Sequence, residues 1–304
     1  MLLGFLVAGL GLGVVPTAAR AASTAGPSVE PSVSSATATG QQWAESPAGT
    51  FRSTVRTVSY AGVDDPQLQM DVRTPTGAAP GRPVVVFLHP GGYYQGDKTM
   101  WAGSARAMTS RGYVTVAVNY RFSTRPDGAW PAQRNDLDHA LAWIRRHGAA
   151  DFAADPTRVA VLGSSAGGHL ALFAQGLPGV KAIVVWSPMV DVRNIAYGVR
   201  RNTLLGRNLI RYTARCPVTA CPTRYLQALR PDGYFNTRPT IPIFAVNSTD
   251  ELIRSAPLLS YRSQVRARGG VFDVALVPGS AHASGQLYGA IAWAGTMRHL
   301  HRYL

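Results

Sequence analysis

Short apolar runs alternate along this chain with longer segments in which apolar residues recur every three or four positions. The runs predict buried β-strands, and the spaced patterns predict helices with one buried face. The predicted strands span residues 52–60, 68–74, 84–88, 158–162, 182–186, 241–247 and 272–277, and the predicted helices span residues 100–111, 131–147, 167–175, 255–268 and 285–302. This alternation is typical of an α/β fold with a mostly parallel sheet, helices on both faces and the first two strands as an antiparallel edge.

The N-terminal part of the chain departs from this pattern. Residues 1–15 are apolar and Ala19-Arg20-Ala21 follows them, so residues 1–21 have the core and cleavage site of a signal peptide and predict a secreted protein. No Lys or Arg precedes the apolar core, which leaves open that the true start lies upstream or that the segment has another role. Residues 22–49 are rich in Ser, Thr, Ala and Pro and predict a disordered linker before one domain at residues 50–304.

The composition fits a large globular domain with a positive surface. The 304 residues are 46% hydrophobic, and the formal net charge at pH 7 is +14. Nearly all of the positive charge comes from arginine, because Lys98 and Lys181 are the only lysines. The arginines are scattered and match no nucleic-acid-binding module, so we expect no nucleic-acid partner and ascribe the charge to a preference for Arg over Lys. The positive charge still predicts a weak attraction to an anionic cell surface.

A turn rich in glycine and serine, Gly163-Ser164-Ser165-Ala166-Gly167, separates the strand predicted at residues 158–162 from the helix that follows. A strand, a tight G-x-S-x-G turn and a helix present a serine hydroxyl above a sheet edge, because the glycines allow a turn too sharp for side chains on either flank. Ser165 is therefore the candidate nucleophile. The five-residue pattern alone is equally compatible with an ordinary turn, so its meaning depends on partners elsewhere in the chain.

Those partners are sought downstream, because a serine hydroxyl becomes nucleophilic only when a neighbouring base accepts its proton. In this kind of site an acid and then a histidine follow the serine along the chain. Asp250 follows the strand at 241–247 and His282 follows the strand at 272–277, so the sequence predicts a triad of Ser165, His282 and Asp250. Glu251 and Asp191 are the alternative acids, and a capping role in its loop is the alternative for His282.

Donors for a developing oxyanion are predicted in the loop after the strand at 84–88, where the sequence reads His89-Pro90-Gly91-Gly92-Tyr93. A substrate can closely approach the backbone N–H groups of Gly91 and Gly92, because no Cβ stands in the way. The N–H of Ala166, next to the candidate nucleophile, is the third predicted donor.

Six ordered blocks of the chain, taken together, resemble the esterase/lipase branch of the α/β-hydrolase superfamily that carries a His-Gly-Gly-Gly oxyanion motif. They are residues 68–75, 89–97, 119–121, 130–136, 155–159 and 163–171. The resemblance implies an α/β-hydrolase fold and structural roles for His89 and His169. The chain departs from the motif at Pro90, which stands in place of the first glycine and has no N–H. In the relatives that it resembles, the donors are the second and third glycines, which match Gly91 and Gly92.

A segment rich in arginine, residues 191–239, interrupts the alternation of strands and helices, at the place where this fold carries a small lid. It contains Cys216 and Cys221, which are expected to form a local disulfide in an exported protein, or to stay two free thiols if the protein is not exported. Aromatic side chains near the site, Tyr93, Tyr94 and Trp186, are the predicted walls of the substrate pocket. The modest size of the insertion favours small or surface-borne esters over long triglycerides.

The sequence thus predicts a serine ester hydrolase that needs no metal or organic cofactor and acts on a small-molecule or polymer-borne ester. An amide-cleaving enzyme with the same triad is one alternative, because both reactions are acyl transfers. A non-catalytic wall-binding or polymer-binding protein on a hydrolase scaffold is another, although such proteins usually lose a triad residue. Nucleic-acid binding rests on charge alone.

Overall fold

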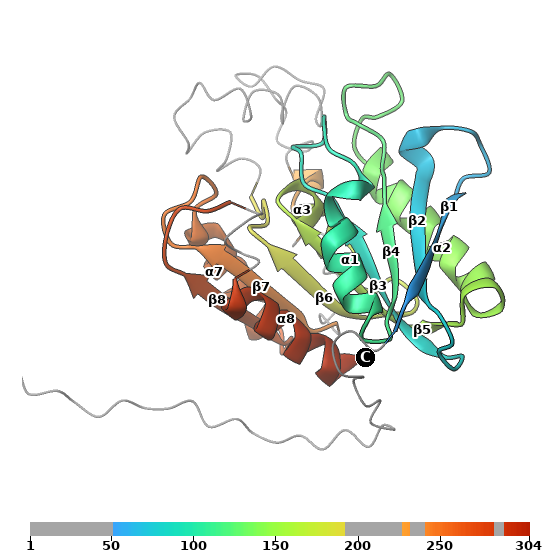
Figure 1. Cartoon of the computed structure of the whole chain (residues 1–304). Helices are drawn as coiled ribbons and strands as arrows, with labels where there is room; N and C mark the ends of the chain where they lie inside the picture. Colours follow the sequence, from blue (N-terminus) through green and yellow to red (C-terminus); the bar gives the residue numbers. More distant parts are fainter. Residues whose placement is uncertain (1–50, 192–226, 232–240, 283–288) are drawn as a thin grey trace, which may run out of the picture. The chain divides into compact units, whose positions relative to one another are not determined.

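The computed structural model describes residues 51–191, 227–231, 241–282 and 289–304 (Figure 1). Its centre is an eight-stranded sheet in the order β1-β2-β4-β3-β5-β6-β7-β8. The strands are β1 (Ser53–Ser59), β2 (Gln69–Pro75), β3 (Arg82–Leu88), β4 (Val114–Val118), β5 (Ala154–Ser164), β6 (Val180–Trp186), β7 (Ile243–Ser248) and β8 (Phe272–Val277). Strand β2 pairs antiparallel with β1 and β4, and every pairing from β4 onward is parallel. The mostly parallel sheet with an antiparallel edge is therefore confirmed.

The sequence prediction omitted strand β4. Thr115 interrupts its apolar run, and this polar residue is only 1% exposed. Its hydroxyl lies 2.9 Å from the hydroxyl of Thr109, so the polar group is satisfied inside the core.

Five α-helices accompany the sheet in the described residues: α1 (Ala102–Thr109), α2 (Ala132–Phe152), α3 (Ala166–Leu172), α7 (Ser255–Ala267) and α8 (Ala290–Tyr303). Two short 3-10 helices, η1 (Pro66–Leu68) and η2 (Lys98–Trp101), complete these elements. Helix α2 continues past its predicted end at His147, through Gly148, because Phe152 at its last turn is buried in the core. It stops at Ala153, whose φ of 55° is left-handed.

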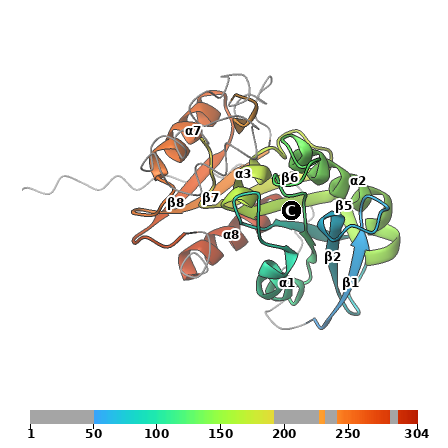
Figure 2. The same cartoon turned by 90° about the horizontal axis from the view of Figure 1, so that it is seen from above.

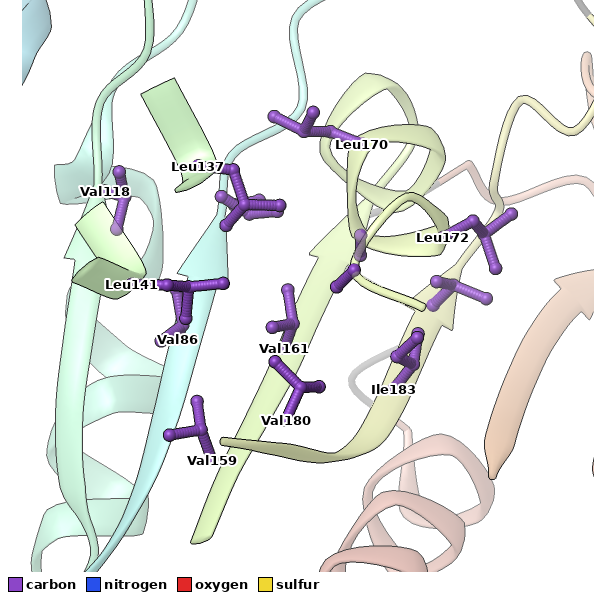
Figure 3. Close-up of a cluster of buried hydrophobic side chains, with 14 of the residues drawn as sticks. Val86, Val118, Leu137, Leu141, Val159, Val161, Leu170, Leu172, Val180 and Ile183 are labelled. Carbon is purple, nitrogen blue, oxygen red and sulfur yellow. The ribbon is translucent and has the colours of Figure 1, made fainter. Parts of the chain in front are cut away.

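The helices cover both faces of the sheet (Figure 2). Alternate strand residues point to opposite faces, so β3 places Val84 and Val86 in one core and Val85 and Phe87 in the other. Helices α2, α3 and α7 pack on the first face, and α1 and α8 pack on the second. Figure 3 shows the first core between β3, β5 and β6, with Leu137 and Leu170 of the covering helices among its members.

Several predicted features lie outside the described residues. They are the signal peptide at 1–21, the linker at 22–49, the pair Cys216 and Cys221, and most of the insertion at 191–239. Within the described ranges, no helix combines the length and apolar character needed to cross a membrane.

Acid should destabilise this fold before its carboxylates titrate. Burial lowers the pKa of His89, His169 and His299 from 6.5 to about 4. Between these values the unfolded chain binds protons that the folded chain does not, so the free energy of unfolding falls as pH falls. We expect a loss of about 2 kcal/mol per histidine between pH 6.5 and pH 4.5, measured by urea unfolding. His299→Gln should lose less than wild type across this interval, and a wild-type stability equal at both pH values would contradict the prediction.

Candidate active site

Ser165 occupies a sharp turn and is the single residue between strand and helix. Strand β5 ends at Ser164 and helix α3 begins at Ala166. The φ of Ser165 is 51° and its ψ is −116°, an uncommon conformation for a residue with a side chain. Its N–H donates to the Trp186 carbonyl at 2.9 Å, which ties the turn to the neighbouring strand β6. The strand, turn and helix predicted for this segment are therefore all present.

Two glycines of the motif are required by close packing. A Cβ at Gly163 would lie 2.1 Å from the Gly167 carbonyl oxygen. A Cβ at Gly167 would lie 2.2 Å from the Leu88 oxygen and 2.5 Å from the His89 oxygen. The start of α3 therefore lies directly against the end of β3 and the loop that follows it.

We expect Gly167→Ala to destabilise the protein severely, because its methyl group would overlap two backbone carbonyl groups that cannot easily move. The melting temperature should fall by roughly 10 °C or more, as a loss of a few kcal/mol implies for a domain of this size. Gly103→Ala in α1 is the matched control, because its new Cβ meets nothing within 4 Å. A Gly167→Ala protein as stable as the Gly103→Ala control would contradict the packing argument.

The imidazole of His282 lies between the serine and a carboxylate. Its Nε2 is 2.9 Å from Ser165 Oγ, and its Nδ1 is 2.6 Å from Glu251 Oε2. An ionised carboxylate only accepts hydrogen bonds, so Nδ1 carries the proton and the Nε2 lone pair faces the serine hydroxyl. This is the arrangement in which a histidine can accept the serine proton.

Glu251, and not the predicted Asp250, is the acid beside His282. The Glu251 side chain is completely buried, and its Oε1 accepts hydrogen bonds from Ser187 Oγ at 2.8 Å and from the Ser248 N–H at 2.9 Å. Asp250 is exposed, and among the described residues its carboxylate accepts only a 3.3 Å hydrogen bond, from its neighbour Thr249. The sequence prediction of Asp250 is therefore wrong, and its stated alternative Glu251 occupies the position.

The turn after β7 explains why the acid is one residue later than predicted. The Asp250 N–H donates to the Gly279 carbonyl at 2.9 Å, which fixes the turn against the loop after β8 and leaves the Asp250 side chain in solvent. Glu251, the next residue, points inward. Asp191, the other alternative, lines a small cavity beside α7 with Arg230 and Tyr261.

The predicted oxyanion donors Gly91 and Gly92 lie in the loop after β3, whose first residue, His89, lies against the start of α3. Gly91 and Gly92 have φ values of 126° and 62°, which glycine adopts readily. A Cβ at Gly91 would lie 1.8 Å from the Gln95 carbonyl oxygen, so only glycine fits there. In the described part of the chain, no acceptor takes the N–H groups of Gly91, Gly92 or Ala166. These donors are therefore available to a ligand, as a helix N-terminus and a glycine loop often are.

Two of the three predicted pocket walls belong to the core instead. Trp186 is fully buried on the face covered by α1 and α8, where its Nε1 donates to Thr296 Oγ1 at 3.1 Å and its ring packs on Trp101. Tyr93 is also fully buried, with its hydroxyl 2.7 Å from His169 Nδ1. Neither side chain is open to a substrate. Tyr94 is partly exposed, so its role as a pocket wall stays a prediction.

The structural roles expected for His89 and His169 agree with their surroundings. Both side chains are fully buried, and burial lowers the pKa of each to about 4, so both are neutral near pH 7. His89 stacks on Tyr120 with ring centroids 4.1 Å apart. The contacts that hold Glu251 were missed: no local pattern marks Ser187, whose hydroxyl donates to Glu251 from the end of the neighbouring strand, or the backbone N–H of Ser248, which donates within the turn after β7.

Comparison with known proteins places the chain in a family. The family model described as BD-FAE matches residues 70–232, more than half of the 304 residues. The chain belongs to the BD-FAE family. The matched region of this BD-FAE protein includes the loop after β3 and the Ser165 turn, whereas Glu251 and His282 lie beyond it.

Curated relatives of this BD-FAE protein include two from Mycobacterium tuberculosis. The probable carboxylic ester hydrolase LipM is 39% identical over 108 residues, which are 34% of this chain and 23% of LipM. The carboxylesterase NlhH is 35% identical over 140 residues, which are 44% of this chain and 42% of NlhH. The chain therefore aligns with less than half the length of each.

Solved esterase structures share the fold over most of the chain. Thermogutta terrifontis esterase 2 has a TM-score of 0.65 at 19% identity and covers 80% of this chain and 91% of its own. Esterase B from Lactobacillus rhamnosis has a TM-score of 0.68 at 16% identity, and the match covers 85% of this chain and 87% of the esterase B chain. This BD-FAE protein has the α/β-hydrolase fold, and the family resemblance drawn from the six sequence blocks is confirmed.

Proposed function

We propose that this protein is a serine ester hydrolase in which Ser165, His282 and Glu251 form the catalytic triad. The observation that carries the proposal is the pair of hydrogen bonds made by one imidazole, at 2.9 Å to Ser165 Oγ and at 2.6 Å to Glu251 Oε2. These three residues come from the ends of β5, β7 and β8, at the carboxyl edge of the parallel sheet. Relatives named as carboxylic ester hydrolases and esterases support the reaction class.

The geometry supports acyl transfer in two halves. Ser165 Oγ attacks the ester carbonyl carbon while His282 Nε2 accepts the hydroxyl proton, and the resulting tetrahedral intermediate carries its negative charge on the former carbonyl oxygen. His282 then donates that proton to the leaving alcohol as the carbon–oxygen bond of the ester breaks. Water repeats the sequence on the acyl-enzyme, releases the acid and restores the Ser165 hydroxyl.

The other groups stabilise charge during these steps. The buried carboxylate of Glu251 stabilises the imidazolium and holds the Nδ1 proton in place. The N–H groups of Gly91, Gly92 and Ala166 are the proposed oxyanion donors, and each such donor typically contributes about 3–4 kcal/mol to transition-state stabilisation. The reaction needs no metal or organic cofactor.

The proposed substrate is a class of esters, and the proposed location is outside the cytoplasm. The substrate is a small or polymer-borne carboxylic ester, with Tyr94 as a wall of its site. Export, with a Cys216–Cys221 disulfide, is supported by the apolar residues 1–15 and the Ala19-Arg20-Ala21 site. A non-reduced digest of protein recovered from the medium should contain one linked cysteine peptide.

The purified protein should hydrolyse p-nitrophenyl acetate. We expect its kcat/KM for p-nitroacetanilide, the matching amide, to be at least about 100-fold lower. The two substrates share the acyl group and the aromatic ring, so only the scissile bond differs. A kcat/KM greater for the anilide would assign the site to amide cleavage. A protein that cleaves neither compound and does not react with a fluorophosphonate would be a binding protein on a hydrolase scaffold.

A further inference from the structure

Three consecutive residues after β3 have a positive φ: Gly91 at 126°, Gly92 at 62° and Tyr93 at 68°. Glycine adopts this conformation freely, but a tyrosine carries a Cβ that disfavours it. Contacts elsewhere in the structure must therefore hold Tyr93 in place. Since Tyr93 directly follows the two glycines, whatever holds it also fixes their N–H groups.

Both the side chain and the carbonyl group of Tyr93 are held. The side chain has no exposed surface, and its hydroxyl lies 2.7 Å from His169 Nδ1. The carbonyl oxygen accepts hydrogen bonds from the Ser123 N–H at 2.7 Å and the Ser123 hydroxyl at 2.9 Å. The rings of Tyr120 and Trp130 lie edge-on to the Tyr93 ring, with centroids 5.9 and 6.4 Å away.

The hydrogen bond between Tyr93 and His169 has one direction. His169 Nε2 lies 2.6 Å from the Leu229 carbonyl oxygen, which can only accept, so Nε2 carries the ring proton. Burial lowers the pKa of His169 to about 4, so Nδ1 is an unprotonated acceptor at neutral pH. The Tyr93 hydroxyl is therefore the donor, and no other donor is needed at Nδ1.

This hydrogen bond connects the two parts of the proposed oxyanion hole. His169 belongs to α3, and its N–H donates to the Ser165 carbonyl at 2.9 Å, one helical turn from the nucleophile. The same helix begins with Ala166, the third proposed donor. Gly91 and Gly92 lie on the other side of the bond, in the loop that Tyr93 continues.

We propose that Tyr93 is a positioning residue for ester hydrolysis, whose hydroxyl, through His169, holds the Gly91 and Gly92 donors in register with Ser165 and Ala166. The inference rests on the proposed function. Without the hydroxyl, the loop can relax toward a more common φ at residue 93, which would move the donors away from the oxyanion.

The test is Tyr93→Phe, which keeps the buried ring and removes only the donor. We expect kcat for p-nitrophenyl acetate to fall about 10- to 100-fold with KM changed less than about threefold, because displaced donors weaken transition-state binding and spare ground-state binding. The affinity for a trifluoromethyl ketone, which forms a tetrahedral adduct with the serine, should fall by a similar factor. A purely structural role would leave the affinity and kcat unchanged in the folded protein.

Tyr60→Phe is the matched control. Tyr60 is 3% exposed, and its hydroxyl donates at 2.9 Å to the Asn119 carbonyl, so the same truncation removes a comparable hydrogen bond outside the proposed site. It should lower the melting temperature and leave kcat and the ketone affinity near wild type. Equal kinetic losses in Tyr60→Phe and Tyr93→Phe would overturn the proposal.

Variants of His169 give a second test if Tyr93→Phe does not fold. Asparagine can place its Oδ1 near the position of Nδ1 and accept from Tyr93, whereas glutamine reaches toward Leu229 and leaves Tyr93 without its acceptor. His169→Asn should therefore retain a higher kcat than His169→Gln, and the reverse order would overturn the inference. A wild-type protein inactive on esters would refute the proposed function itself, whereas an active enzyme insensitive to Tyr93→Phe would refute only the role of Tyr93.

Discussion

Ser165→Ala is expected to lower kcat for p-nitrophenyl acetate by about 10⁶-fold, because it removes the atom that forms the acyl-enzyme. Ser165 is 5% exposed, and in the described structure its hydroxyl contacts His282 Nε2, so removing one oxygen should leave the fold intact. The measurement is steady-state hydrolysis at matched protein concentration, with the melting temperature as a check on folding.

Ser164→Ala is the matched control for this loss. Ser164 is the neighbouring serine, 1% exposed and part of β5, and it has no place in the proposed mechanism. Its activity should stay within about threefold of wild type, as for a substitution that changes little packing. Strong residual hydrolysis in Ser165→Ala, or an equal loss in Ser164→Ala, would show that another serine is the nucleophile.

Glu251→Gln should lower kcat by about 10⁴-fold, because the substitution forces the wrong tautomer of His282. Ser187 Oγ and the Ser248 N–H both donate to Oε1, so the glutamine must place its carbonyl oxygen there. Its NH₂ group then faces His282 Nδ1, which must accept, and the ring proton moves to Nε2. An Nε2–H cannot accept the proton of Ser165.

Asp250→Asn is the matched control, since it makes the same change one residue earlier on an exposed side chain. It should leave kcat within about twofold of wild type. The comparison decides between the two adjacent acids by steady-state kinetics on purified, folded variants. A loss confined to Asp250→Asn would contradict the structure and restore the acid predicted from the sequence.

Local patterns made the nucleophile turn predictable. Gly163, Ser165 and Gly167 act within one strand, one turn and one helix, so their spacing, together with partners in the expected chain order, predicted the local geometry that is present in the structure. The mostly parallel sheet and its antiparallel edge followed in the same way from the alternation of apolar runs and helical patterns, whereas the order of the strands in the sheet was not predicted.

The acidic residue of the triad could not be identified from the sequence, because its identity depends on which residue of the turn after β7 points inward. Asp250 and Glu251 both follow β7, and a hydrogen bond to Gly279, in a loop far along the chain, determines which one faces inward. Strand alternation likewise puts Trp186 on the same face as Ala182 and Val184, but it does not tell which face helices α1 and α8 will cover. Contacts between distant segments decide both questions.

Locating the residue that a fluorophosphonate modifies, by intact mass and peptide mapping, tests directly whether His282, held by Glu251, activates Ser165. We expect one adduct per chain, on Ser165, with labelling slowed by orders of magnitude in His282→Ala. An adduct on another serine, or equally fast labelling of Ser165 without His282, would contradict this mechanism.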